Sequence, residues 1–495
     1  MNPVTLKELR QLTRSRTIAG AIVGFFLLQL VAAALVVVAQ TDSAGEIDSD
    51  AGELVFGWLA ALLAPVLAFV VPGNLFARLV SEHGPGRAEL MSATALRPSA
   101  LIDGKIRSGL AMLALFLSGA MPFLLCSYLL GGVDVLFVLS WSLAIALCAS
   151  LAVHLSIFLA ALRAPAAVRW CAWAFAAIPC VPFALLSAEG YRHECDWDEW
   201  PFLLFGAAAI ATANLLLRGA AIALVSPPAT DRVRPLRLTA LGLWLAWLAV
   251  LVGWGLHDGT PSEGVLFFSV FAGIGALLLA AFDLSTASGF SRRVLIDRPR
   301  SRLRRLLRLP FTTGAEGGLA FACGLLAAGA AGAAFVCTFG HPDADARNGT
   351  VGCHVAFAYL LAALLLARAI ARVPALARRN LHRFAALAAA AFVLLAMLLP
   401  NVLAVGGGFD PDLAPFNLSG ITTPGVRWSH GSRVGTSGNL LHHARWALSF
   451  LAIALALHAV PFLRALRTYV SGRRSAPDGS ARPGDAERGP VDASA

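Results

Sequence analysis

The chain has 495 residues, of which 58% are hydrophobic and only 14% are charged. In soluble domains about a quarter of the residues are charged, so this composition excludes a water-soluble globular protein. The net charge of +10 at pH 7 does not indicate a nucleic-acid-binding protein, because the basic residues lie in short segments between long apolar blocks.

Repeated apolar blocks divide the chain, and each is close to the roughly 20 residues that cross the hydrocarbon core as a helix. A backbone in lipid must satisfy its own hydrogen bonds, so the blocks predict an all-α, polytopic membrane protein. We predict about twelve spans, at residues 17–40, 54–77, 109–131, 135–161, 166–188, 201–226, 238–256, 264–285, 316–339, 352–375, 384–406 and 441–464.

The spans form a first membrane half at residues 17–230 and a second at 231–470. Residues 471–495 are rich in Gly, Pro and Arg and have nothing to bury, which predicts a disordered cytoplasmic tail. A short link at Leu162–Pro165 leaves open whether the fourth and fifth spans are separate or one kinked helix.

Charge placement predicts the orientation of these spans. With twelve spans and the N-terminus inside, all but five of the 39 basic residues lie on the inner side; the five are Arg192, Arg347, Arg427, Arg433 and Arg445. Lys and Arg are retained on the cytoplasmic side of short loops, so both chain ends are predicted to be cytoplasmic. Abundant Arg, Ala and Leu with only two lysines are typical of a GC-rich bacterial genome, which points to the inner (cytoplasmic) membrane.

Residues 1–16 predict an amphipathic helix ahead of the first span. Asn2 suits the cap of this helix and Pro3 its first position. Leucines recur every three residues and polar residues occupy the other faces: Leu6, Leu9 and Leu12, against Lys7, Glu8, Arg10, Gln11 and Arg14. Such a helix would lie in the headgroup layer. The alternative is a basic flank that only fixes the topology.

The first inner loop, at residues 77–108, is more patterned than topology requires. A Gly-Pro-Gly turn interrupts it, and residues 87–96 then predict a short helix that Pro98 ends. Ser99 is the predicted cap of a second helix, which continues through Lys105 into the third span. Two helices hinged at the membrane face could receive force from a soluble partner; the alternative is a solvated loop.

Both segments carry sequence motifs. The chain opens with NPVTLKELRQLTRSR. Three stretches of the inner loop align with short sequence motifs. Arg87–Leu90 lies at the position of a G-T-L-E-x-L motif and Ala93–Ser99 at that of a T-P-L-S motif. Leu101–Lys105 matches an I-x-x-G-K motif, and this match is the closest of the three. On these residues the chain resembles permease subunits of the type-2 ATP-binding-cassette (ABC) exporter family, over residues 1–190. It departs from the family pattern at Glu82-His83, which replaces an acidic-basic-acidic run.

The resemblance implies an interfacial elbow helix at the N-terminus and an export permease driven by a separate ABC ATPase subunit, with no cofactor in this chain. It implies that the ATPase couples to the inner loop through Arg87, Glu89, Leu90, Thr94, Pro98, Gly104 and Lys105. Arg87 and Glu89 would contact the ATPase, and Pro98 and Gly104 would shape the hinge. The chain would work alone, as a homodimer or with a second permease.

The inner loop at residues 286–313 holds eight arginines, interleaved with leucines. This pattern predicts a basic amphipathic segment at the membrane surface, with Arg292, Arg293, Arg304, Arg305 and Arg308 as its basic residues. Contact with a second ATPase subunit is the alternative.

The sequence lacks signals that other functions require. The only Gly-Lys pair, Gly104-Lys105, has no upstream glycine spacing, so no P-loop is present and the chain itself is not expected to hydrolyse ATP. The span interiors hold essentially no carboxylates, which disfavours an ion-coupled secondary transporter. That class remains an alternative, as does a non-transporting scaffold or an enzyme acting on a lipid-linked substrate.

Histidine and cysteine placement predicts neither a metal site nor a nucleophile. His154 and His458 lie within spans and are expected to be hydrogen-bonded packing residues, and the adjacent His442 and His443 lack ligand spacing. Cys337 and Cys353 flank one outer loop and could form a disulfide in an oxidising compartment.

Overall fold

The structure is a computed structural model. It describes residues 3–14, 16–41, 51–82, 97–131, 133–162, 166–177, 200–227, 231–258, 292–296, 298–312, 315–339 and 436–471, with a few single positions between 358 and 369. The regular secondary structure of these residues is helical, which confirms the predicted all-α class. The chain divides into two compact units, residues 1–246 and 247–495, which we describe separately.

Six helices in the described part of the chain are long and apolar enough to cross a membrane: Ile18–Ala39, Ala51–Glu82, Pro98–Leu129, Val135–Ala161, Leu204–Val225 and Ala447–Val470. A bent pair, Arg302–Phe311 with Glu316–Ala331, gives a seventh candidate. These helices are those of a membrane-embedded protein. Of the other predicted spans, 264–285 and 384–406 lie outside the described residues, so the count of twelve and the orientation remain predictions.

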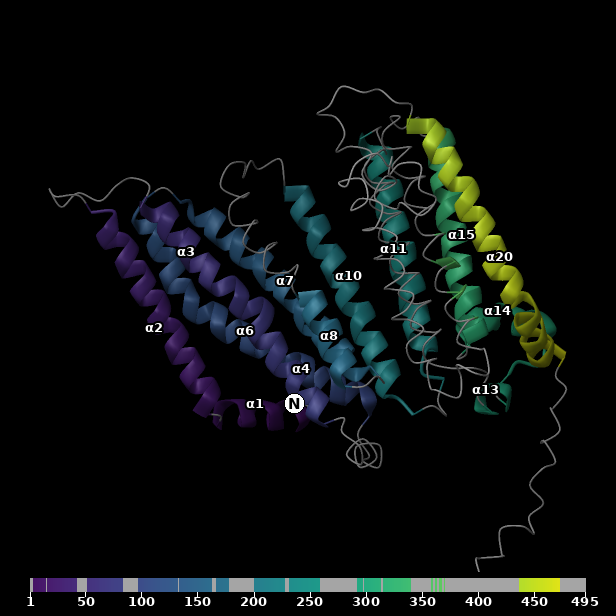
Figure 1. The fold of residues 1–495 in the computed structure, drawn as a ribbon, viewed down its shortest axis with the longest axis horizontal. Coiled ribbons are helices and arrows are strands. Elements are labelled where there is room, and N and C mark those ends of the chain that lie inside the picture. Colours follow the sequence, from purple (N-terminus) through teal and green to yellow (C-terminus); the bar gives the residue numbers. More distant parts are fainter. Residues whose placement is uncertain are drawn as a thin grey trace, which may run out of the picture. The chain divides into compact units, whose positions relative to one another are not determined.

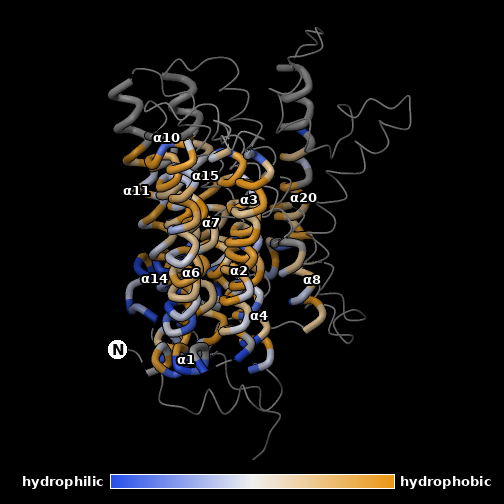
Figure 2. Tube along the Cα trace, turned by 90° about the vertical axis from the view of Figure 1, so that its left-hand side faces the viewer, coloured by the Kyte–Doolittle hydropathy of each residue, from blue (hydrophilic) through white to orange (hydrophobic). Residues whose placement is uncertain are grey.

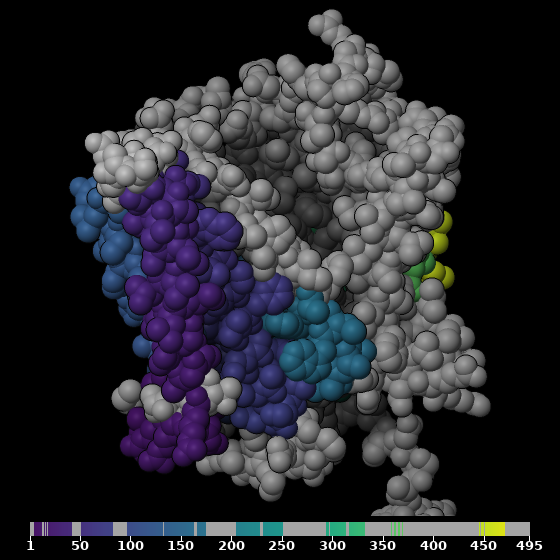
Figure 3. Space-filling view, turned by 60° about the vertical axis from the view of Figure 1, so that its left-hand side comes forward, coloured from purple at the N-terminus to yellow at the C-terminus, as the bar shows by residue number. Residues whose placement is uncertain are grey.

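The first unit is a set of long helices crossed at one end by a short one. Helix α1 (Pro3–Arg14) runs across the end of α2 (Arg16–Ala39) (Figure 1), and both lie on one face of the unit (Figure 3). The remaining elements are α3 (Ala51–Pro65), η1 (Val66–Val70), α4 (Val71–Glu82), α6 (Pro98–Leu129), α7 (Val135–Ala161), α8 (Ala166–Ala177), α10 (Trp200–Val225) and the start of α11 (Arg234–Asp258), whose residues from Trp247 on belong to the second unit. The core packs mainly between α3, α6 and α7, around residues such as Phe56, Leu63, Phe116 and Trp141.

Helices α3, η1 and α4 form one continuous segment despite two internal prolines. Proline has no backbone N–H, so Pro65 and Pro72 disturb the regular helical ladder. The chain accommodates them with a π-helical turn, in which the Val71 N–H donates to the Val66 carbonyl. The segment continues to Glu82, beyond the predicted end of the second span at residue 77.

Helix α6 begins well before the predicted third span. Pro98 occupies its first turn and Arg97 its N-terminal cap position, so the prediction that Ser99 caps the helix is wrong. Proline suits the first helical position because its missing N–H would have no partner there. From Pro98 the helix runs without a break through Lys105 to Leu129, as predicted for its path into the third span.

At the far end of α6, close packing depends on two glycines. Gly131 has a φ of 90° and ends the helix in the left-handed conformation that favours glycine. A Cβ on Gly52 would collide with the carbonyl oxygens of Gly131 and Ser127, so glycine lets the start of α3 approach the end of α6.

The outer surface of α2 is apolar along its length. Val23, Leu27, Leu35 and Val38 are each more than half exposed. The long helices are mostly hydrophobic, and hydrophilic residues gather at α1 and α14 (Figure 2). Large exposed aliphatic side chains on a long helix are expected where lipid is the surrounding solvent.

In the second unit the described elements are α13 (Arg292–Ile296), α14 (Arg302–Arg308), η3 (Leu309–Phe311), α15 (Ala315–Phe339) and α20 (Thr436–Ser471). One small core joins α15 to α20 through Ala322, Leu365 and Ala454. A second buries Tyr469 of α20 against Val294 and Leu309.

Candidate functional site

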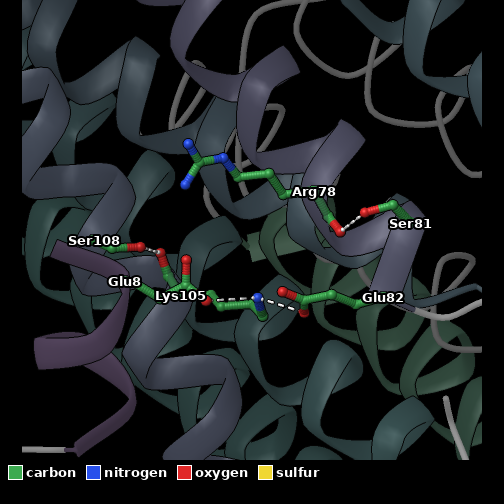
Figure 4. Close-up of polar contacts among 6 residues, drawn as sticks. All are labelled: Glu8, Arg78, Ser81, Glu82, Lys105 and Ser108. Carbon is green, nitrogen blue, oxygen red and sulfur yellow. Dashed lines mark hydrogen bonds and ion pairs between the residues drawn. The ribbon is translucent and has the colours of Figure 1, made fainter. Parts of the chain in front are cut away.

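A buried lysine holds three helices together at the end of the first unit where α1 lies. Lys105 of α6 places its Nζ 3.1 Å from Oε1 of Glu8 on α1 and 2.7 Å from Oε2 of Glu82 on α4 (Figure 4). The side chains of Lys105 and Glu8 are only 5% and 6% exposed, and that of Glu82 is 33% exposed. We call Glu8, Glu82 and Lys105 the Lys105 cluster.

The charges of the Lys105 cluster are interdependent. A buried ammonium group is costly unless counter-charges and hydrogen bonds surround it, and the same is true of the buried Glu8 carboxylate. The ammonium of Lys105 lies between two carboxylates and satisfies both. Removing Lys105 would leave Glu8 buried with its cation gone, which would weaken the contact between α1 and α6.

The position of the Lys105 cluster in the chain links it to the inner loop. Glu82 is the last described residue before residues 83–96, and after them Arg97 caps α6, which begins at Pro98. Lys105 lies two helical turns into α6 and bonds back to Glu82. The two helices that flank residues 83–96, α4 and α6, are therefore joined to each other and, through Glu8, to α1.

Gly104 lets α1 approach α6 closely. A Cβ at Gly104 would lie 2.7 Å from both Cβ and Cγ1 of Val4 and 3.3 Å from the backbone nitrogen of Thr5. Both of these α1 residues are buried. Helix α6 is continuous at Gly104, and the contact with α1 explains a glycine there; the hinge role that the resemblance implies stays a prediction.

The neighbouring Asp103 ties α6 to α10. Its carboxylate accepts two hydrogen bonds from Arg218, at 2.6 Å from Nε and 2.7 Å from Nη2. Paired bonds of this kind fix the relative orientation of the two side chains as well as their distance. Asn214, one turn earlier on α10, donates to the hydroxyl of Ser150 on α7 and adds a second polar contact between helices.

Successive residues therefore connect α6 to different helices. Residues on an α-helix project about 100° apart, so Asp103, Gly104 and Lys105 point in three directions. Asp103 pairs with α10, Gly104 contacts α1, and Lys105 bonds to α1 and α4. A displacement of the first two turns of α6 would act on all three neighbours.

Some predicted coupling residues lie in this site and others cannot be placed. Pro98, Gly104 and Lys105 are in the first turns of α6. Four lie outside the described residues: Arg87, Glu89, Leu90 and Thr94.

Sequence reasoning missed Glu8, Glu82, Asp103 and Arg218 as site residues. Glu8 was predicted on the polar face of the first helix, which is wrong: it is only 4% exposed. The helix itself is confirmed from Pro3 to Arg14, but its buried side carries Val4, Thr5 and Glu8, and Leu6 is 37% exposed. The scarcity of lysine is the sequence signal that could have indicated the site. A single lysine in a helix that enters a span needs a carboxylate partner, because a buried charge is costly without one.

The two histidines within spans are packing residues, as predicted. His154 Nδ1 lies 2.7 Å from the Ser150 carbonyl, one turn earlier on α7, and His458 Nε2 lies 2.9 Å from the Leu365 carbonyl. Among the described residues, no group of three or more His, Cys, Asp or Glu could hold a metal ion. The Cys337–Cys353 disulfide remains a prediction, because Cys353 lies outside those residues.

The basic loop of the second unit forms two short helices. Arg292 and Arg293 begin α13, and Arg304, Arg305 and Arg308 lie on α14. The predicted amphipathic helix is thus α14, and its place at a membrane surface remains a prediction.

Amine labelling tests the burial of Lys105 with an internal reference. Lys7 is exposed on α1 and Lys105 is buried in the cluster, and the sequence contains no other lysine. Lys105 can react only when the structure opens locally, so we expect it to be modified at least roughly tenfold more slowly than Lys7. Peptide mass spectrometry after timed acetylation in mild detergent measures both rates. Equal rates would contradict the burial.

The family resemblance rests on the opening segment and the inner loop that this site joins. The contact of α1 with α6 brings those two stretches together. Comparison of the chain with protein-family models, with curated proteins and with solved structures finds no match.

Proposed function

We propose that this chain is the transmembrane permease subunit of an ABC transporter and exports its substrate with energy from a separate ATPase subunit. The observation that carries the proposal is the Lys105 cluster. It joins α1 to the helices that flank residues 83–96, and the opening segment and this inner loop are the two stretches whose residues resemble the family's elbow helix and coupling loop.

The contacts of α6 supply a route for force in this proposal. An ATPase that binds residues 83–96 through Arg87 and Glu89 would move the start of α6. Lys105 would carry that movement to α1 and α4, and the Asp103–Arg218 pair would carry it to α10. Charge-assisted contacts suit this task because they resist separation, most of all the buried Lys105–Glu8 pair in its low-dielectric setting.

The proposal includes the finer topology that the charge pattern predicts. The chain would cross a bacterial inner membrane about twelve times with both ends inside, which places residues 83–96 and the basic loop at 286–313 in the cytoplasm with the ATPase.

Photolabelling with an azido-ATP analogue tests the proposal directly. The tagged chain, in its native membranes, is irradiated with the analogue and then purified in mild detergent. We expect the label on a separate co-purifying polypeptide and none on the chain itself. Excess unlabelled ATP should abolish the signal.

Two results would contradict the proposal. Label on this chain would mean that it binds nucleotide itself. If no labelled polypeptide is recovered even after cross-linking in the membrane, the chain would instead be an ion-coupled transporter or a non-transporting membrane protein. Sensitivity of its activity to uncouplers would separate these two.

A further inference from the structure

Helix α14 presents an exposed apolar stripe. Leu303, Leu306 and Leu307 are 67%, 46% and 67% exposed, and their i, i+3, i+4 spacing places them on one face of the helix. No residue of α14 is buried. Ile296, at the end of α13, is 71% exposed as well.

The rest of α14 is basic. Arg302, Arg304, Arg305 and Arg308 occupy the other faces, and residues 298–312 contain no Asp or Glu. The helix is therefore strongly hydrophilic away from its leucines (Figure 2). A large aliphatic stripe beside a concentration of positive charge fits the boundary between acyl chains and anionic headgroups.

One arginine has a structural task that sets it apart from the others. The guanidinium of Arg305 donates to three carbonyls: Pro299 at 2.6 Å, Val470 at 2.7 Å and Arg300 at 3.1 Å. The Val470 carbonyl belongs to the last turn of α20, where helical carbonyls lack intrahelical partners. Arg305 thus fixes α14 to the end of α20, whereas Arg302 and Arg304 are exposed.

The direction of α14 is also fixed. The segment Arg302–Phe311 is bent by 83° from Glu316–Ala331, which is apolar and lies within α15. Gly317 makes the tight corner possible, because a Cβ there would lie 2.6 Å from the Thr312 carbonyl oxygen and 2.7 Å from that of Leu309. If α15 crosses the bilayer, a helix at nearly a right angle to it lies in the plane of the membrane surface.

From this geometry we propose that α14 is a binding surface for anionic phospholipids of the bilayer in which the chain sits. Leu303, Leu306 and Leu307 insert among the upper acyl chains, and Arg302 and Arg304 bind the headgroup phosphates. Arg305 acts only by positioning the helix. The proposal goes beyond transport and does not depend on an ATPase partner.

Hydrogen–deuterium exchange of the full chain in nanodiscs tests the proposal. One set of discs contains only phosphatidylcholine, and in the other roughly a third of the lipid is phosphatidylglycerol. Each arginine near an anionic surface strengthens binding about fivefold. We expect the amides of residues 302–308 to exchange roughly tenfold more slowly in the anionic discs, and this difference to shrink in about 1 M salt.

Matched variants show which arginines are responsible. Arg302→Gln with Arg304→Gln should abolish the dependence on phosphatidylglycerol. Arg464→Gln with Arg467→Gln removes the same charge from exposed positions on α20 and should leave it intact. Unchanged thermal unfolding of both double variants confirms that they fold.

Three outcomes would overturn the proposal. The first is equal exchange of wild-type α14 in the two kinds of disc, and the second is lipid dependence that survives loss of Arg302 and Arg304. The third is protection that ignores lipid composition but rises with the number of chains per disc, because it would assign the leucine stripe to a second copy of the chain.

Discussion

Replacement of Lys105 by methionine is expected to destabilise the folded chain by about 3–5 kcal/mol, because it removes one partner of a buried ion pair. Methionine matches the length of lysine but leaves the Glu8 carboxylate, only 6% exposed, without its cation and close to Glu82. Thermal unfolding in mild detergent, followed by loss of monodisperse protein, measures the change.

Two further variants isolate the charge effect. Lys7→Met removes the other lysine, which is exposed, and should change stability by no more than about 0.5 kcal/mol. Adding Glu8→Gln to Lys105→Met removes the unpaired carboxylate and should restore most of the lost stability, giving a clear coupling energy in a double-mutant cycle. Equal stability of the two single lysine variants would contradict the Lys105 cluster.

Replacement of Gly104 by alanine is expected to separate α1 from α6. The new methyl group would lie 2.7 Å from Val4, so either α1 or the side chain must move. Overpacking of this kind costs about 1–3 kcal/mol. The specific readout is the acetylation rate of Lys105, which should approach that of Lys7 once α1 no longer covers it.

Gly20→Ala is the matched control for Gly104→Ala. Gly20 lies in α2 with nothing within 4 Å of the position that the alanine methyl group would occupy, so alanine there should be neutral or slightly stabilising. Continued protection of Lys105 in the Gly104→Ala variant would show that α1 does not pack on α6 at this point. Adding Val4→Gly to Gly104→Ala removes both Val4 carbons that the new methyl group would meet and should restore part of the protection.

Local patterns in the sequence were sufficient to predict several of the long apolar helices that the structure describes. The span predicted at 135–161 is helix α7, Val135–Ala161, because a capping residue begins it: the Asp134 side chain accepts a hydrogen bond from the Leu136 N–H. The first span, predicted at 17–40, is α2, Arg16–Ala39. Length and hydropathy determine such elements without reference to the rest of the fold.

The candidate site could be predicted only in part, because it depends on contacts between distant segments. Lys105 and Glu8 are 97 positions apart, and Arg218 and Asp103 are 115 apart. The family resemblance singled out Gly104 and Lys105 but gave no partner for either. Hydrophobic periodicity placed Glu8 on the polar face of the first helix, since it cannot anticipate a buried cation on another helix.

Helix extension beyond the predicted spans was the second feature that the sequence pattern did not reveal. Hydropathy predicts that the second span ends at residue 77 and that the third begins at residue 109. In the structure the second helix continues to Glu82, and the third already begins at Pro98. These polar extensions carry the Lys105 cluster. Apolar patterning marks where lipid begins, not where a helix ends.

Affinity purification of the tagged chain in mild detergent tests the central claim most directly, comparing wild type with the double charge reversal Arg87→Glu and Glu89→Lys. We expect an ABC ATPase to co-purify with wild type and to be lost in the reversal, while slow acetylation of Lys105 in both proteins shows that the fold is intact. Absence of any ABC ATPase from the wild-type sample, even after cross-linking in intact membranes, would contradict it.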